Sequence, residues 1–134
     1  MKRVMVFGSY DLLHDGHKYL FKRAKKLGDE LIVVVARDST IERVKGESPL
    51  YGERERLGKV EEVDDVDRAV LGYKGNKMRI VEKIMPDVIA LGYDQNSFVE
   101  RLEKEIENRG WGIKVVRLGS FKPNKFKSSL LKKG

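Results

Sequence analysis

Several residue types that support common kinds of protein chemistry are absent or scarce in this chain of 134 residues. It has no cysteine, which excludes disulfides, thiolate zinc sites and cysteine nucleophiles. It has only two histidines, and its longest apolar run, residues 31–36, is far too short to cross a bilayer. A strand-like segment follows Met1 at once, so we expect no signal peptide, no membrane segment and a cytoplasmic protein.

Charge is what the chain has in abundance. Charged residues make up 37% of it and the formal net charge is +7, which suits a soluble globular protein that attracts polyanions such as nucleotides. Much of the excess lies near the C-terminus, at Lys122, Lys125, Lys127, Lys132 and Lys133. This tail is either a solvated charged end or a phosphate-facing segment. No repeat or linker divides the sequence, so we expect residues 1–134 to form a single domain.

Predicted strands and helices alternate along the chain. Apolar runs predict strands over residues 2–7, 30–36, 67–71, 87–91 and 113–118. Amphipathic patterns predict helices over residues 15–26, 38–44, 53–63, 77–84 and 97–109, and a short basic helix over residues 127–133. Asp38 or Ser39 would cap the second helix, and the fourth must end before Pro86. This order predicts an α/β fold, a Rossmann-like five-stranded parallel sheet with helices on both faces.

The segment after the first predicted strand, residues 8–17, contains the most informative chemistry and reads GSYDLLHDGH. In open α/β sheets, ligands bind beyond the carboxyl ends of the strands. Gly8 allows a close turn, and Gly16 leaves room beside a helix start whose amides could hold a phosphate. His14 and His17, three residues apart, would aim two imidazoles at one point. The pair could instead be structural, or a metal site, although the sequence offers no third ligand nearby.

The same segment resembles a known signature, the G-x-[FY]-D-x-x-H-x-G-H motif of the cytidylyltransferase-like nucleotidyltransferase superfamily. The segments VVVARDST and PDVIALGYDQ are most similar to its archaeal FAD synthase group. The resemblance implies a Rossmann-like enzyme that transfers AMP from ATP to FMN, giving FAD and pyrophosphate by direct in-line attack on the α-phosphate. It also implies Mg²⁺ bound with the ATP. Relatives of this fold often dimerise, so a homodimer is an open alternative to a monomer.

The resemblance also implies roles for individual residues. Four would be catalytic: His14, His17, Lys45 and Arg56. The imidazoles would contact the triphosphate, Lys45 would bind phosphate, and Arg56 would reach phosphates or the acceptor. Besides the two histidines, the nucleotide-binding set would contain Gly8, Ser9, Tyr10, Asp11, Gly16, Gly92, Asp94, Ser128 and Ser129. Asp11 could equally stabilise a turn, and Ser128 and Ser129 could cap a helix. No protein side chain is expected to bind the metal, because Mg²⁺ often relies on substrate phosphates.

The C-terminal segment departs from the superfamily pattern. Cytidylyltransferases of this type have an R-T-x-G-I-S-[ST]-T segment there, and this chain has lysines in place of the arginine. Lysine lacks the bidentate fork of arginine, so specificity for cytidine and glycerol phosphate does not follow. Two alternatives stay open. One is a cytidylyl- or adenylyltransferase that acts on a polyol or sugar phosphate. The other is a non-catalytic nucleotide- or nucleic-acid-binding module, although no recognised RNA-binding module is present and no nucleic acid partner is expected.

Overall fold

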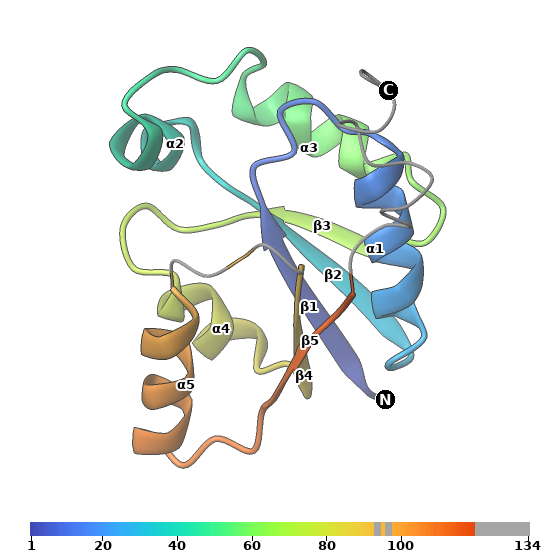
Figure 1. The fold of residues 1–134 in the computed structure, drawn as a ribbon, viewed down its shortest axis with the longest axis vertical. Coiled ribbons are helices and arrows are strands. Elements are labelled where there is room, and N and C mark those ends of the chain that lie inside the picture. Colours follow the sequence, from blue (N-terminus) through green and yellow to red (C-terminus); the bar gives the residue numbers. More distant parts are fainter. Residues whose placement is uncertain (93–94, 96–97, 120–134) are drawn as a thin grey trace.

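The computed structural model describes residues 1–92, 95 and 98–119. Its centre is one parallel sheet of five strands in the order β3-β2-β1-β4-β5 (Figure 1). The strands are β1 (Arg3–Gly8), β2 (Glu30–Val35), β3 (Arg68–Leu71), β4 (Val88–Leu91) and β5 (Lys114–Arg117). The predicted α/β fold with a five-stranded parallel sheet is therefore confirmed.

The strands β1 and β2 are apolar on both sides because both faces of the sheet are covered. In β1, Val4 and Val6 belong to one core and Met5 and Phe7 belong to the other. The register pairs Gly8 of β1 with the last residue of β2, so the two strands end at the same level. The segments that follow β1 and β2 therefore leave the sheet side by side.

Two pairs of helices cover the sheet (Figure 1). On one face lie α1 (Asp15–Lys25) and α3 (Glu53–Glu61), and on the other lie α4 (Met78–Ile84) and α5 (Val99–Asn108). The helix α2 (Asp38–Lys45) belongs to neither of these two apolar clusters, although its residues Thr40 and Ile41 are buried. Because it follows β2 directly, it stands at the carboxyl end of the sheet, where ligands bind in folds of this kind.

The predicted boundaries agree with the structure to within about two residues, as is normal for helix and strand ends. As expected, α4 ends before Pro86, and Met85 between them has a φ of 49°. The predicted cap of α2 was wrong. The residue before this helix is Arg37, and it makes no side-chain capping bond, because the Asp38 carboxylate is used elsewhere. The predicted helix over residues 127–133 lies outside the described residues.

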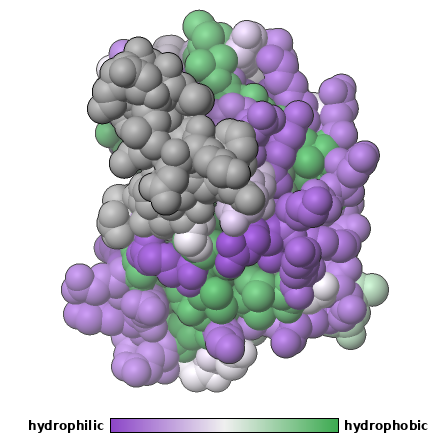
Figure 2. Space-filling view, turned by 45° about the vertical axis from the view of Figure 1, so that its right-hand side comes forward, coloured by the Kyte–Doolittle hydropathy of each residue, from purple (hydrophilic) through white to green (hydrophobic). Residues whose placement is uncertain are grey.

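Hydrophilic side chains cover most of the face shown in Figure 2, with an apolar area in its lower half. Within the described part of the chain, no helix has the length and apolar composition needed to span a membrane.

Candidate active site

The segment between β1 and α1 leaves the sheet at the point where the strand order changes direction. β1 pairs with β2 on one side and with β4 on the other, so connections run to opposite sides from this position. Ligands of doubly wound folds bind in the crevice at this point. We call residues 8–14 and the first turn of α1, taken together, the histidine loop. This loop follows β1 directly and so lies at that crevice.

His14 and His17 cap the start of α1 with their own rings. His14 immediately precedes the helix, and its Nδ1 accepts a hydrogen bond from Gly16 N at 3.0 Å. The Nδ1 of His17 accepts one from His14 N at 3.2 Å, which completes a reciprocal capping box. The two rings stack with centroids 3.9 Å apart. The imidazoles thus come together, although only His17 is inside the helix.

These capping bonds fix the tautomer of both rings. A ring nitrogen that accepts a bond from a backbone N–H has no proton of its own, so the neutral form of each histidine has its proton on Nε2. Each ring is therefore held as an Nε2–H donor, the form that can bind a phosphate oxygen. The Gly16 N–H, which the sequence suggested for phosphate binding, is engaged by His14 instead.

The loop bends sharply beneath the histidines. Tyr10 has a φ of 54°, and its buried ring lies edge-on to His17 with centroids 5.2 Å apart. A Cβ atom on Gly8 would approach this ring to 2.5 Å, so the turn requires glycine there. Burial raises the pKa of Tyr10, whose hydroxyl has no hydrogen-bond partner among the described residues. The Tyr10 ring thus supports the histidine loop from the core side.

Asp11 ties the histidine loop to the segment between α2 and α3. Its carboxylate accepts hydrogen bonds from Leu50 N at 2.7 Å and from Tyr51 N at 2.8 Å. These two bonds hold the pKa of Asp11 below its ordinary value, and the bond from Leu50 has the larger effect. The positive charges of Arg56 and Lys45 lower the pKa further. Of the two readings of Asp11, these contacts favour the one in which it stabilises a turn.

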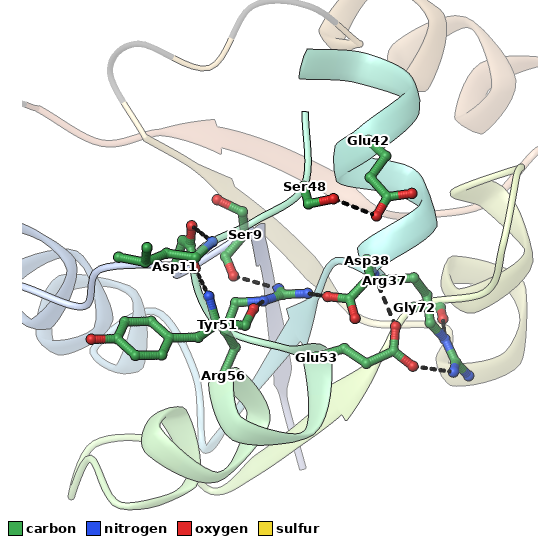
Figure 3. Close-up of polar contacts among 11 residues, drawn as sticks. Ser9, Asp11, Arg37, Asp38, Glu42, Ser48, Tyr51, Glu53, Arg56 and Gly72 are labelled. Atoms are coloured by element: carbon green, nitrogen blue, oxygen red, sulfur yellow. Dashed lines mark hydrogen bonds and ion pairs between the residues drawn. The ribbon is translucent and has the colours of Figure 1, made fainter. Parts of the chain in front are cut away.

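Arg56 lies at the centre of the polar network in Figure 3 and is completely buried. Its guanidinium donates to Ser9 O at 2.7 Å and to Tyr51 O at 2.9 Å, and it pairs with Asp38 Oδ1 at 2.8 Å. These partners come from the histidine loop, the segment before α3 and the start of α2. Arg56 therefore joins three segments of the site from inside the protein.

A second link joins the start of α2 to the end of β3 (Figure 3). Glu53 accepts a hydrogen bond from Asp38 N at 2.9 Å and pairs with Arg37 Nη1 at 3.1 Å. The Nε of Arg37 donates in turn to Gly72 O at 2.7 Å. The carboxyl end of β3 is thus held in place relative to α2.

On the other side of β1, Gln95 bridges the strand ends at the crevice. Its Nε2 donates to Phe7 O at 2.9 Å and its Oε1 accepts from Gly92 N at 2.8 Å. Arg117 donates to Gly92 O at 2.9 Å. Gln95 is the last residue of the segment PDVIALGYDQ, but the sequence predicted no role for it, and it did not indicate Arg117. An amide side chain just after a buried strand is the only signal that pointed to Gln95.

A pocket of about 240 Å³ opens beside the histidine loop, on the α4 and α5 side of the sheet. Three aromatic rings line it, those of Phe7, Tyr73 and Phe98. Of the site residues expected from the sequence, Gly8, Ser9 and Lys45 also line it. Lys45 is the last residue of α2 and is exposed. Arg37 and Lys77 are also part of the lining. The pocket therefore combines an aromatic, largely apolar wall with three basic side chains.

The structure brings together most of the expected site residues that it describes: the histidine loop, Lys45, Arg56 and Gly92. Asp94, Ser128, Ser129 and the lysines of the tail lie outside the described residues. Within the described ranges, no three His, Asp or Glu side chains gather as metal ligands would.

Comparison with known proteins adds a family to this geometry. Residues 5–134 match the Cytidylyltransferase-like family. The chain belongs to this family. A relative from Aciduliprofundum boonei, an FAD synthase, is 50% identical over 121 residues, which cover 90% of this chain and 80% of the relative. The FAD synthase of Thermoplasma volcanium is 44% identical over 133 residues, 99% of this chain and 93% of the relative.

Solved structures place the chain in the same fold. The crystal structure of a lipopolysaccharide core biosynthesis protein from Thermoplasma volcanium is 46% identical and superposes with a TM-score of 0.85, covering 91% of this chain and 99% of the other. Pantothenate synthetase from Thermus thermophilus, 13% identical, superposes with a TM-score of 0.66 over 90% of this chain and 56% of its own length. At that identity the likeness concerns the fold alone. The cytidylyltransferase-like resemblance inferred from the sequence is confirmed.

Proposed function

We propose that this cytidylyltransferase-like protein is an FAD synthase, which transfers AMP from ATP to FMN and releases pyrophosphate. The observation that carries the proposal is the stacked histidine pair, held in one tautomer at the crevice of the sheet. The proposal is also supported by relatives named FAD synthase, which align with most of the chain. We further propose that the reaction takes place in the cytoplasm. A homodimer stays a prediction, which a measurement of molar mass in solution checks.

The triphosphate would lie against the histidine loop, with the Nε2–H groups of His14 and His17 directed to its oxygens. Lys45 would bind phosphate at the edge of the pocket. Gly8 allows the close approach of the chain, while Gly92, Asp94, Ser128 and Ser129 remain proposed contacts for the rest of the nucleotide. Arg56, Asp11 and Tyr10 act as positioning residues in this proposal. Arg56 and Asp11 bond to the backbone of other segments, and the Tyr10 ring is buried beneath the histidine loop.

FMN would place its flavin ring in the 240 Å³ pocket. The ring is flat and largely apolar, and the pocket has three aromatic walls and several aliphatic ones. Its phosphate would extend toward Ser9 and Lys45, and so toward the triphosphate. The two substrates then approach from opposite sides of the β1 end, which is the arrangement that in-line transfer needs.

The chemistry requires little more than positioning and charge. An oxygen of the FMN phosphate, already an anion at neutral pH, attacks the α-phosphorus of ATP and forms a P–O bond. The bond from that phosphorus to the bridging oxygen breaks, and the electron pair leaves with pyrophosphate. No proton has to be removed from the nucleophile, so no general base is needed. The histidine donors and Lys45 stabilise the charge that accumulates on the phosphates in the transition state.

Mg²⁺ enters this proposal as part of the substrate. Since the described residues offer no cluster of metal ligands, the triphosphate oxygens would supply most of its coordination. When bound, the ion neutralises phosphate charge. The residues of this chain hold and orient the nucleotide that contains it.

The test is to incubate the protein with Mg²⁺ and pairs of substrates, and to measure both pyrophosphate and the nucleotide product. We expect FAD and pyrophosphate in equal amounts from ATP and FMN. Turnover of CTP with glycerol phosphate, and none of ATP with FMN, would contradict the proposal and favour the polyol alternative. Binding of nucleotides with no pyrophosphate released from any pair would favour a non-catalytic module.

A further inference from the structure

A second pocket, of about 450 Å³, adjoins the one proposed for the acceptor. The two share the wall formed by Gly75, Lys77 and Phe98. Its lining residues come from α2, from the segment that joins β3 to α4, and from α4 and α5. In Figure 1 that segment lies between α2 and α5. Apart from this shared wall, it contains none of the residues assigned to the transfer reaction.

Three cations from separate segments line this pocket: Arg43 of α2, Lys77 before α4, and Arg101 of α5. Within the described part of the chain, Arg43 and Arg101 have no ion pair or hydrogen bond. Other arginines are engaged, for example Arg37 with Glu53 and Arg56 with Asp38. Cations that lack carboxylate partners therefore meet at one concave surface.

The single acidic residue in the lining does not neutralise them. Glu105 pairs with Arg109, the residue that follows α5, with 2.9 Å between Arg109 Nε and Glu105 Oε1. This bond directs the carboxylate to a cation outside the pocket lining. The pocket therefore keeps an excess of positive charge.

Lys77 is the cation of this pocket that is most withdrawn from water. It is half-buried, and its Nζ lies 5.1 Å from the centroid of the Phe98 ring. Burial lowers the pKa of Lys77, and the charge of Arg43 lowers it further. Arg43 and Arg101 are exposed. A half-buried ammonium group beside two exposed guanidinium groups concentrates positive charge at the pocket, which favours the binding of an anion.

We propose that the pocket lined by Arg43, Lys77 and Arg101 is a second anion site, which binds the phosphates of an oligophosphate. Two guanidinium groups offer paired donors that match phosphate oxygens, and the ammonium adds a point charge. A lysine-rich helix surface, such as the outer face of α1, is convex and comes from one segment. Here three segments converge on one hollow, which makes a compact anion a better fit than bulk solvent. The proposal concerns a separate site and does not depend on the FAD synthase assignment.

The experiment is a calorimetric titration of the full chain with pyrophosphate at low ionic strength. The histidine loop also offers phosphate donors, so the titration is done in the His14→Asn/His17→Gln background, which removes both imidazoles. We expect saturable binding to persist there, and to weaken about tenfold or more when Arg43→Gln and Arg101→Gln are added.

Two matched variants separate the pocket from net charge. Arg54→Gln/Lys104→Gln removes the same two charges from exposed positions outside the pocket, and it should weaken binding less than about threefold if the site is specific. Arg43→Lys/Arg101→Lys keeps the charges but removes the paired guanidinium donors, so its affinity should lie between those of the wild-type pocket and the glutamine variant. Equal losses in the pocket variant and in the control overturn the proposal. Complete loss of binding in the histidine background alone also overturns it.

Further titrations identify the recognised group. If phosphates are recognised, ADP should bind comparably to pyrophosphate, whereas adenosine should not bind. Adenosine binding as tightly as ADP would contradict an oligophosphate site. Neither outcome involves FMN or turnover, so a failure here is distinct from a failure of the proposed function.

Discussion

The histidine loop and the far end of α2 face the same edge of the sheet, but they are held very differently. The loop is fixed at three points: Ser9 O by Arg56, Asp11 by two amides, and the imidazoles by the backbone N–H groups of His14 and Gly16. Gln95 holds Phe7 O, directly before the loop. Lys45, by contrast, is an exposed cation at the last residue of its helix, followed by Gly46 with a φ of 81°. This difference in constraint suits the two regions to two tasks, transition-state stabilisation and substrate binding.

Donors that stabilise a transition state act best when their positions are set before the substrate arrives. The histidine loop meets this requirement because its tautomers and ring positions follow from backbone bonds. A long lysine side chain can instead follow a charged group as it enters or leaves. We therefore expect substitutions in the loop to affect the chemical step, and substitutions at Lys45 to affect substrate affinity.

The largest expected effect comes from the double variant His14→Asn/His17→Gln. Asparagine is a good N-cap and glutamine suits the third helical position of a capping box, so the helix start is kept. Both imidazole donors are lost, and we expect kcat to fall at least about 100-fold. Steady-state kinetics and thermal unfolding measure the two quantities separately.

His14→Ala/His17→Ala is its control, because it removes the cap as well as the donors. This variant should lose activity and, in addition, about 1 kcal/mol of unfolding free energy. If the Asn/Gln variant keeps wild-type turnover, the histidines serve only to cap the helix.

The next effect is on stability, from Arg56→Met. The substitution leaves Ser9 O, Tyr51 O and one oxygen of Asp38 without their buried donor. We expect the free energy of unfolding to fall by about 2–4 kcal/mol in urea titrations. Arg54→Met, on the exposed side of the same helix, should change it by less than about 0.5 kcal/mol. Lost activity with unchanged stability would instead make Arg56 a substrate contact.

Lys45→Met tests the less constrained side of the comparison. We expect the KM for one substrate to rise about tenfold, with kcat changed much less, because one charged contact is removed from the ground state as well as the transition state. Lys45→Arg should restore most of the affinity. Lys22→Met, which removes an exposed charge from α1, serves as the control for net charge. A fall in kcat as large as that of the histidine variant would remove the distinction between the two regions.

The smallest effect concerns pH and Asp11→Asn. Since the pKa of Asp11 is lowered in the folded chain, its ionised form stabilises the fold above the ordinary carboxyl pKa of about 3.9, and this contribution disappears as the pH falls through the lower folded value. The melting temperature of the variant should therefore lie below that of the wild type at pH 7, and the difference should shrink as the pH falls below the ordinary carboxyl pKa of about 3.9. Asp64→Asn, at an exposed position, should show no such convergence.

The sequence predicted the sheet because its strands are short, continuous apolar runs, as buried parallel strands require. It also indicated the histidine loop, since two histidines and two glycines in ten residues are a local pattern. Arg56 is different. Only the family resemblance singled it out, because its local sequence does not distinguish it from exposed Arg54. Its buried contacts are with Ser9 and Asp38, which are 47 and 18 residues away in the sequence.

The same reasoning explains the other differences. Aspartate is a residue type that often caps helices, but the carboxylate of Asp38 pairs with Arg56 and does not cap α2. Gln95 bridges two strands that are adjacent only in the folded sheet. Arg43, Lys77 and Arg101 come from three segments, so no window of sequence could show that they share a pocket.

A helix that caps itself with imidazoles has a consequence for the resting protein. Most bare helix starts depend on water or an incoming anion to satisfy their first amides. In α1 those of Gly16 and His17 are already bonded to His14. Between turnovers, these two amides therefore keep their bonds when the product departs, and the start of α1 needs neither water nor an anion to complete it.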